Sequence, residues 1–176
     1  MIRAAIYSAG PSLTESWRGG YDVGIAINRA AFVVPQLYWQ WLSAGDLLAR
    51  PEIFADYPIP ASGYFAMRDN MFTQYPKTHN DRHLLIWDAL PPLPGDTRFS
   101  ITASLHLAAY LGAGEITVYG HDQQVIRPTG DPYIDPFAYG ENRKQIEGQE
   151  VDKAVALLGT IGVHVTFIAQ IHQESP

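Results

Sequence analysis

A short apolar run followed by a tight turn, at the start of the chain, most strongly limits what this sequence can fold into. Residues 2–7 (IRAAIY) have the pattern of a buried parallel strand, and residues 10–13 (GPSL) follow directly. Gly10 lets the backbone turn without a Cβ clash. Pro11 suits the first turn of a helix, where its missing N–H costs no hydrogen bond. The stretch therefore predicts a strand, a turn and the start of a helix.

The same alternation of apolar runs, loops and helical patterns continues along the chain. Further strands are predicted at residues 22–27, 37–42, 63–67, 83–87, 116–119 and 163–168. Short helices are predicted at residues 29–34 and 47–56, and longer ones at residues 100–111 and 141–158, where apolar residues recur at helical spacing. This order predicts an α/β fold with a mostly parallel, twisted sheet and helices on both faces.

Length and composition exclude several classes of protein. A chain of 176 residues, 47% hydrophobic and 17% charged, is expected to form one domain over residues 1–176. The net charge of −6 argues against a duplex nucleic acid partner, which normally requires a basic surface. The chain has no cysteine, which excludes disulfides and thiolate zinc sites. No signal-peptide pattern and no membrane-spanning apolar run are present, so a cytoplasmic protein without a membrane partner is expected.

Polar and glycine-rich segments follow several of the predicted strands. Because the carboxyl ends of parallel strands meet at one edge of a sheet, we expect these segments to gather there and to form a ligand site. They are residues 10–13, Asn28, residues 43–46, the turn at Ser100 and residues 120–122. The hydroxyl of Ser12 and the unpaired amides of a helix start favour a phosphate. An ordinary strand-to-helix connection explains the same four residues, 10–13, equally well.

His121 and Asp122 follow the strand predicted at residues 116–119. A histidine beside a ligand can serve as a general base, and a carboxylate can assist it. The alternative is a surface histidine and an aspartate that caps a turn. Asp46 and Asp122 could also hold Mg²⁺ together with the phosphates of a nucleotide. A helix N-cap is the simpler role for Asp46, and no spacing in the sequence requires a metal.

A long segment rich in Pro, Asp, Gly and Tyr separates the last strand-end segment from the last helix. Loops as long as residues 123–140 are often lids or binding loops. Tyr133 and Tyr139 in this segment could stack on a base or bond a phosphate, or they could anchor the loop by packing. The four tryptophans are expected in the core or at an interface, which leaves a homo-oligomer open.

Taken in order, these segments resemble a known superfamily. The features that carry the resemblance are GPSL at residues 10–13, a second strand ending in Asn28, SITAS at residues 100–104 leading to YLG at 110–112, and GHD at 120–122. They resemble the Rossmann-like superfamily of bacterial CMP-sialic-acid sialyltransferases, archaeal 6-hydroxymethyl-dihydropterin diphosphokinases and motility accessory factors. The resemblance implies a single-domain, three-layer Rossmann-like fold that binds a nucleotide or nucleotide sugar.

The resemblance also implies which residues contact the nucleotide. Gly10, Pro11 and Ser12 would lie along its phosphate or ribose. Asn28 would hydrogen-bond it, and Ser43 would make a further polar contact. The helix that faces the phosphate would begin at Ser100 and Thr102, and Gly120 would let the backbone approach the ligand.

Two departures from the family pattern bear on catalysis. The sialyltransferases have Asn immediately before the glycine of GPSL, where this chain has Ala9, and their base histidine falls in a region that reads IEGQ here, at residues 146–149. His121 is the nearest replacement for that base, and Glu147 is the second candidate. The sequence thus predicts a nucleotide-dependent, glycosyltransferase-like transferase. A nucleotide-binding module without catalysis, or a pterin diphosphokinase-like transferase, is the alternative.

Overall fold

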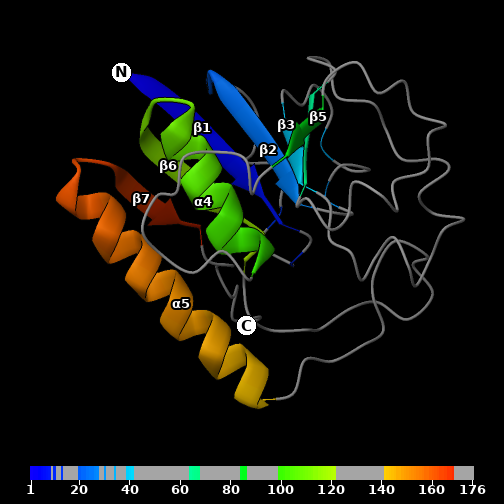
Figure 1. The fold of residues 1–176 in the computed structure, drawn as a ribbon, viewed down its shortest axis with the longest axis vertical. Coiled ribbons are helices and arrows are strands. Elements are labelled where there is room, and N and C mark those ends of the chain that lie inside the picture. The colour runs from blue at the N-terminus through cyan, green and yellow to red at the C-terminus, as the bar shows by residue number, and fades with distance from the viewer. Residues whose placement is uncertain are drawn as a thin grey trace, which may run out of the picture.

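The computed structural model describes residues 1–8, 10, 13, 20–27, 30, 34, 39–41, 64–67, 84–86, 99–121 and 141–168. Seven strands and two helices lie within these residues (Figure 1). The strands are β1 (Ile2–Tyr7), β2 (Val23–Ile27), β3 (Trp39–Trp41), β4 (Tyr64–Met67), β5 (Leu84–Ile86), β6 (Ala113–Tyr119) and β7 (His164–Phe167). The helices are α4 (Ser100–Tyr110) and α5 (Glu141–Thr160).

All seven strands form one parallel sheet in the order β5-β4-β3-β2-β1-β6-β7. The chain builds the sheet outward from β1 to β5 and then returns to the other side of β1 to add β6 and β7. The direction of building therefore reverses between β1 and β6. In an open parallel sheet, this reversal separates the connections above the two strands and leaves a crevice at their carboxyl ends.

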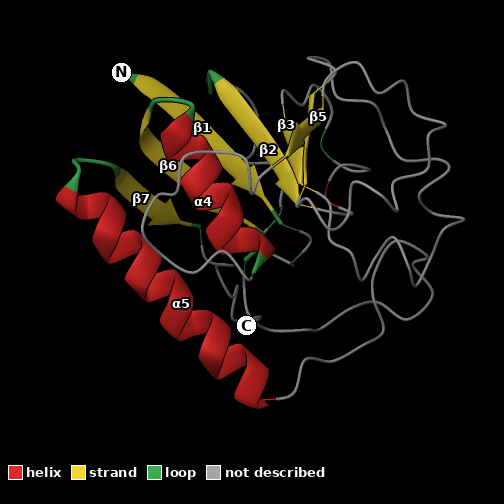
Figure 2. Ribbon diagram, in the orientation of Figure 1, coloured by secondary structure: helices red, strands yellow, loops and turns green. Residues whose placement is uncertain are grey.

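The two described helices cover one face of this sheet (Figure 2). α4 contacts β1, β2 and β6, α5 contacts β7, and the two helices contact each other. Aliphatic side chains of α4, α5 and the central strands form the core between these layers, among them Ile6, Ile25, Leu105, Ile116, Val118 and Leu158. Most residues of the connections between β1 and β5 lie outside the described part of the chain.

The α/β, Rossmann-like fold predicted from the sequence is confirmed. Each of the seven predicted strands has a counterpart, and β6 begins three residues earlier than predicted because Ala113 already pairs with Ile2 of β1. Helix α5 continues two residues beyond its predicted end, to Thr160. The helix predicted at residues 47–56 and the loop predicted at residues 123–140 lie outside the described residues. No helix in the described ranges has the length and apolar character to cross a membrane.

Candidate functional site

The ends of β1 and β6 remain joined beyond the last residues of both strands. The backbone N–H of Ser8 donates to the carbonyl of Tyr119 at 2.8 Å, and the N–H of Gly10 donates to the carbonyl of Gly120 at 2.8 Å. The N–H of Leu13 then donates to the carbonyl of Gly10 at 3.0 Å. The predicted turn after β1 is therefore held against the end of β6, at the place where the sheet reverses its direction of building.

Gly120 is the residue at which the two strand ends come closest. Its φ of +73° lies in the left-handed region, and a Cβ at this position would lie 1.9 Å from the carbonyl oxygen of Ser8. No side chain fits at that distance from a backbone oxygen. The resemblance implies a close approach of the Gly120 backbone to a ligand, and that role stays a prediction. The close approach that the structure shows is between the ends of β6 and β1.

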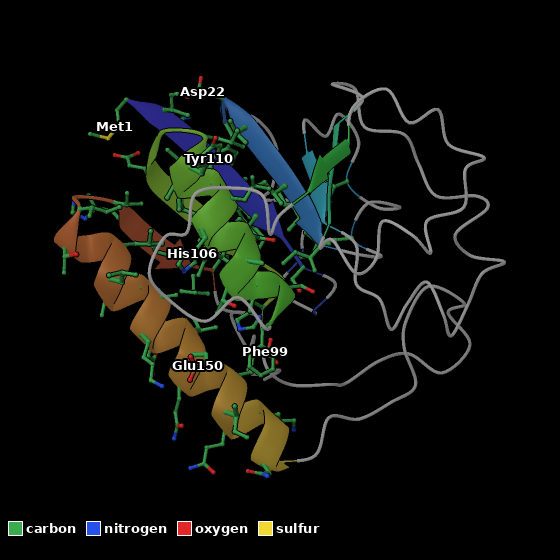
Figure 3. The ribbon with its side chains drawn as sticks, in the orientation of Figure 1. Met1, Asp22, Phe99, His106, Tyr110 and Glu150 are labelled. Carbon is green, nitrogen blue, oxygen red and sulfur yellow. The ribbon has the colours of Figure 1, made fainter. Side chains whose placement is uncertain are left out.

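The amino end of α4 lies at the same end of the sheet. Phe99, the N-cap residue, makes no side-chain capping bond, and the first turn contains no acidic residue. Figure 3 places Phe99 at the lower end of α4, where the strands finish. Ser100 begins the helix and is half-buried, whereas the buried Thr102 donates its hydroxyl to the Phe99 carbonyl at 2.9 Å. The first amides of α4 therefore have no side-chain cap from Phe99, and such amides favour anions.

His121 lies on the helix-covered side of the strand ends. Its ring centroid is 5.9 Å from that of Phe167, at an interplanar angle of 47°. Phe167 shares its face of β7 with Val165, because alternate residues of a strand point the same way, and Val165 packs against the core. The residue is half-buried, and its Nε2 atom is buried. The structure thus places the first candidate base at the carboxyl end of β6, beside the end of β7.

Glu147, the second candidate base, belongs to the inner face of α5. That face continues at helical spacing through three buried residues, Val151, Ala154 and Leu158. Glu147 itself is half-buried. One turn later, Glu150 is buried and its Oε1 accepts a hydrogen bond from Nζ of Lys153 at 2.7 Å. Figure 3 shows Glu150 near the level of Phe99. The part of α5 that precedes Glu150 therefore extends past the amino end of α4.

The structure brings five of the predicted site residues to one end of the sheet: Gly10, Ser100, Thr102, Gly120 and His121. Several other predicted site residues lie outside the described residues, and their roles stay predictions. They are Pro11, Ser12, Asn28, Ser43, Asp122, Tyr133 and Tyr139, and the proposed Mg²⁺ ligand Asp46 lies outside the described residues as well. Within the described ranges, His, Asp and Glu side chains form no group of three or more that could hold a metal ion.

Sequence reasoning missed a cluster of three tyrosines beside the site. Tyr7 and Tyr119 are the last residues of β1 and β6, and their rings stack with centroids 5.7 Å apart. The hydroxyl of Tyr21 lies 2.5 Å from that of Tyr119. Burial and the nearby Tyr21 raise the pKa of Tyr7 to about 12, and burial together with the bond to Tyr21 raises the pKa of Tyr119. The available signal in the sequence was a tyrosine at the last position of each of two predicted strands, residues 2–7 and 116–119.

Comparison with known proteins supports the fold. No protein-family model and no curated protein sequence matches the chain. Among solved structures, the chain is similar to the sialyltransferase CstII from Campylobacter jejuni, determined in complex with a substrate analogue, CMP-3FNeuAc. The TM-score is 0.54, with 14% sequence identity over 95% of this chain and 80% of that chain. The predicted resemblance is thereby confirmed as a sialyltransferase-like fold.

Proposed function

We propose that this protein binds a nucleotide sugar across the ends of β1 and β6 and transfers the sugar to an acceptor. The observation that carries the proposal is the junction of the ends of β1 and β6 in a sialyltransferase-like fold, where Gly10 is bonded to Gly120 and the amino end of α4 lies at the same end of the sheet. Backbone amides at a helix start favour phosphate oxygens even in a chain of net charge −6. The solved neighbour holds a CMP-sugar analogue, which makes a cytidine nucleotide the first ligand to test.

Transfer requires a group that accepts the proton of the attacking hydroxyl. The acceptor oxygen forms a bond to the anomeric carbon while the bond from that carbon to the nucleotide phosphate breaks, and the nucleotide leaves with the electron pair. The imidazole of His121 is our choice for the base, because it directly follows β6 at the joined strand ends. The carboxylate of Glu147 on the inner face of α5 is the alternative.

A titration with nucleotides and nucleotide sugars tests the binding step. CMP and CMP-sialic acid should raise the melting temperature in a concentration-dependent way, because a ligand selective for the native state stabilises it. UDP- and GDP-sugars serve as comparison ligands. Asn28→Ala should reduce the shift by removing a hydrogen bond, by roughly 1–3 kcal/mol if a buried partner is left unpaired. The absence of a shift with every nucleotide tested would contradict the proposal.

A binding module without catalysis is the second candidate function. It is favoured by residues 146–149 (IEGQ), which contain no histidine in the region where the resemblance implies the catalytic base. A transfer and hydrolysis assay with the same nucleotide sugars separates the two. Release of nucleotide by the wild-type protein supports the transferase, whereas binding with no turnover of any donor and acceptor pair supports the module. A pterin acceptor with ATP belongs in the panel to test diphosphate transfer.

A further inference from the structure

The tyrosine cluster lies on the face of the sheet opposite α4. Ala4 and Ile6 of β1 belong to the core beneath the helices, so Tyr7, one residue later, points to the other side. Tyr119 is its register partner on β6. The two rings stack with an interplanar angle of 19°, and each residue is only 5% exposed. The stacked pair therefore forms a rigid unit directly below the joined strand ends.

Tyr21 connects this unit to the opposite end of the sheet. Its ring lies edge-on to Tyr119, with centroids 6.2 Å apart, and the two hydroxyls share a hydrogen bond of 2.5 Å. The guanidinium carbon of Arg3 lies 5.8 Å from the centroid of the Tyr21 ring. The adjacent backbone is fixed by two bonds of 2.8 Å, from the N–H of Arg3 to the Asp22 carboxylate and from the N–H of Asp22 to the Arg3 carbonyl. Figure 3 shows Asp22 near Met1, at the amino end.

We infer that Tyr21 is a positioning residue for the candidate site. Through its bond to Tyr119 it fixes the stack with Tyr7, and the stack holds together the ends of β1 and β6. Those ends carry the two backbone bonds, from Ser8 to Tyr119 and from Gly10 to Gly120, that join the strands at the candidate site. Contacts at the amino end of the sheet thereby control the backbone geometry at the carboxyl end. Only the ligand-binding part of this inference rests on the proposed function.

Amide hydrogen exchange tests the inference without any ligand. In Tyr21→Phe, the hydroxyl of Tyr119 loses its partner, and exchange at the N–H groups of Ser8 and Gly10 should become roughly 3- to 10-fold faster, as expected for loss of one hydrogen bond. The double variant Tyr21→Phe/Tyr119→Phe should lie within about twofold of the single variant, because both lack the same bond. Tyr110→Phe, on the exposed end of α4, is the matched control and should change nothing.

The amide of Val163, bonded to the Leu158 carbonyl at 3.0 Å, reports on the rest of the fold. An equal acceleration at Val163 in Tyr21→Phe would show general destabilisation and would overturn the inference. Unchanged exchange at Ser8 and Gly10 would overturn it as well.

A CMP titration of the same variants tests the consequence for binding. The apparent affinity of Tyr21→Phe for CMP should fall roughly 3- to 10-fold, while that of Tyr110→Phe stays at the wild-type value. An unchanged affinity despite faster exchange at Gly10 would refute the link to the site. If the wild-type protein bound no nucleotide, the proposed function would fail, and the exchange rates would still decide whether Tyr21 positions the strand ends.

Discussion

The two ends of the sheet use glycine for different purposes. At the amino end, Gly162 turns the chain from α5 into β7 with a φ of +81°, and a Cβ there would meet nothing within 4 Å. At the carboxyl end, Gly120 has a similar φ of +73°, but its Cβ would overlap the Ser8 carbonyl. The first glycine satisfies a backbone conformation only. The second glycine also permits the backbones of β1 and β6 to approach each other closely at their ends. The need for a residue without a Cβ therefore distinguishes the end of the sheet where we place the site.

The side chains at the two ends differ as well. The apolar residues Met1, Ile2 and Ile161 are exposed at the amino end, and Phe167 is exposed at the carboxyl end. Among the described residues, His164 begins β7 at the amino end and is exposed, whereas His121 follows β6 at the carboxyl end and lies against Phe167. The pair allows the same substitution to be made at both ends of the sheet.

Between substitutions at the two ends of the sheet, we expect the largest difference in the turnover number. If His121 accepts the proton during transfer, His121→Ala should lower the turnover number by about 10²–10⁴, the usual contribution of a general base, with nucleotide affinity retained. His164→Ala should leave turnover unchanged because its side chain lies at the distant end. Steady-state kinetics with the donor identified by the titration would measure both.

Glu147→Gln decides between the two candidate bases. This variant removes the basic carboxylate and nearly preserves the shape of the side chain. A loss of turnover confined to Glu147→Gln would transfer the role of base to α5. An active wild type that neither substitution slows would exclude both assignments.

The next largest difference is expected in stability. Gly162→Ala should cost roughly 1–2 kcal/mol, the price of a left-handed conformation for a residue with a Cβ. Gly120→Ala must in addition displace the Ser8 carbonyl, so we expect a loss above roughly 3 kcal/mol, outside the usual range for one substitution. Urea unfolding measures both free energies. Equal losses at the two positions would mean that the strand ends relax easily and that the close approach has no structural importance.

A smaller effect concerns the buried histidine between the two ends. Burial in α4 lowers the pKa of His106 below its usual value near 6.5. Below about pH 6.5 the imidazole is protonated in the unfolded chain but stays neutral in the folded chain. The free energy of unfolding is therefore not reduced by this group above about pH 6.5, and it decreases as the pH falls below that value. The contribution of His106 to the slope of the unfolding free energy against pH should reach at most about 1.4 kcal/mol per pH unit, the value for one proton.

Urea unfolding at several pH values between 5 and 7 measures this slope. His106→Gln should flatten it, since glutamine does not titrate. His164→Gln, at an exposed position, should leave the slope at its wild-type value. An unchanged slope in His106→Gln would show that other groups cause the pH dependence.

Much of the fold could be predicted because strands and helices leave local patterns. The run at residues 2–7 and the helical spacing at residues 100–111 identify β1 and α4 from neighbouring residues alone. The polar positions after the strands could be assigned to one end of the sheet, because parallel strands all finish there. The start of β6 was predicted at residue 116, whereas pairing of Ala113 with Ile2 of β1 starts the strand three residues earlier.

The sequence by itself determined the α/β class, the parallel sheet and the end of that sheet at which Gly10, Gly120 and His121 lie. Tertiary structure decided that β1 and β6 are neighbours, that Gly120 touches Ser8, and that His121 packs against Phe167. It also joined Tyr21 to Tyr119 across 98 positions of sequence. The physical reason is that hydrophobic periodicity depends on adjacent residues, whereas a close contact depends on which distant strands pair and in what register.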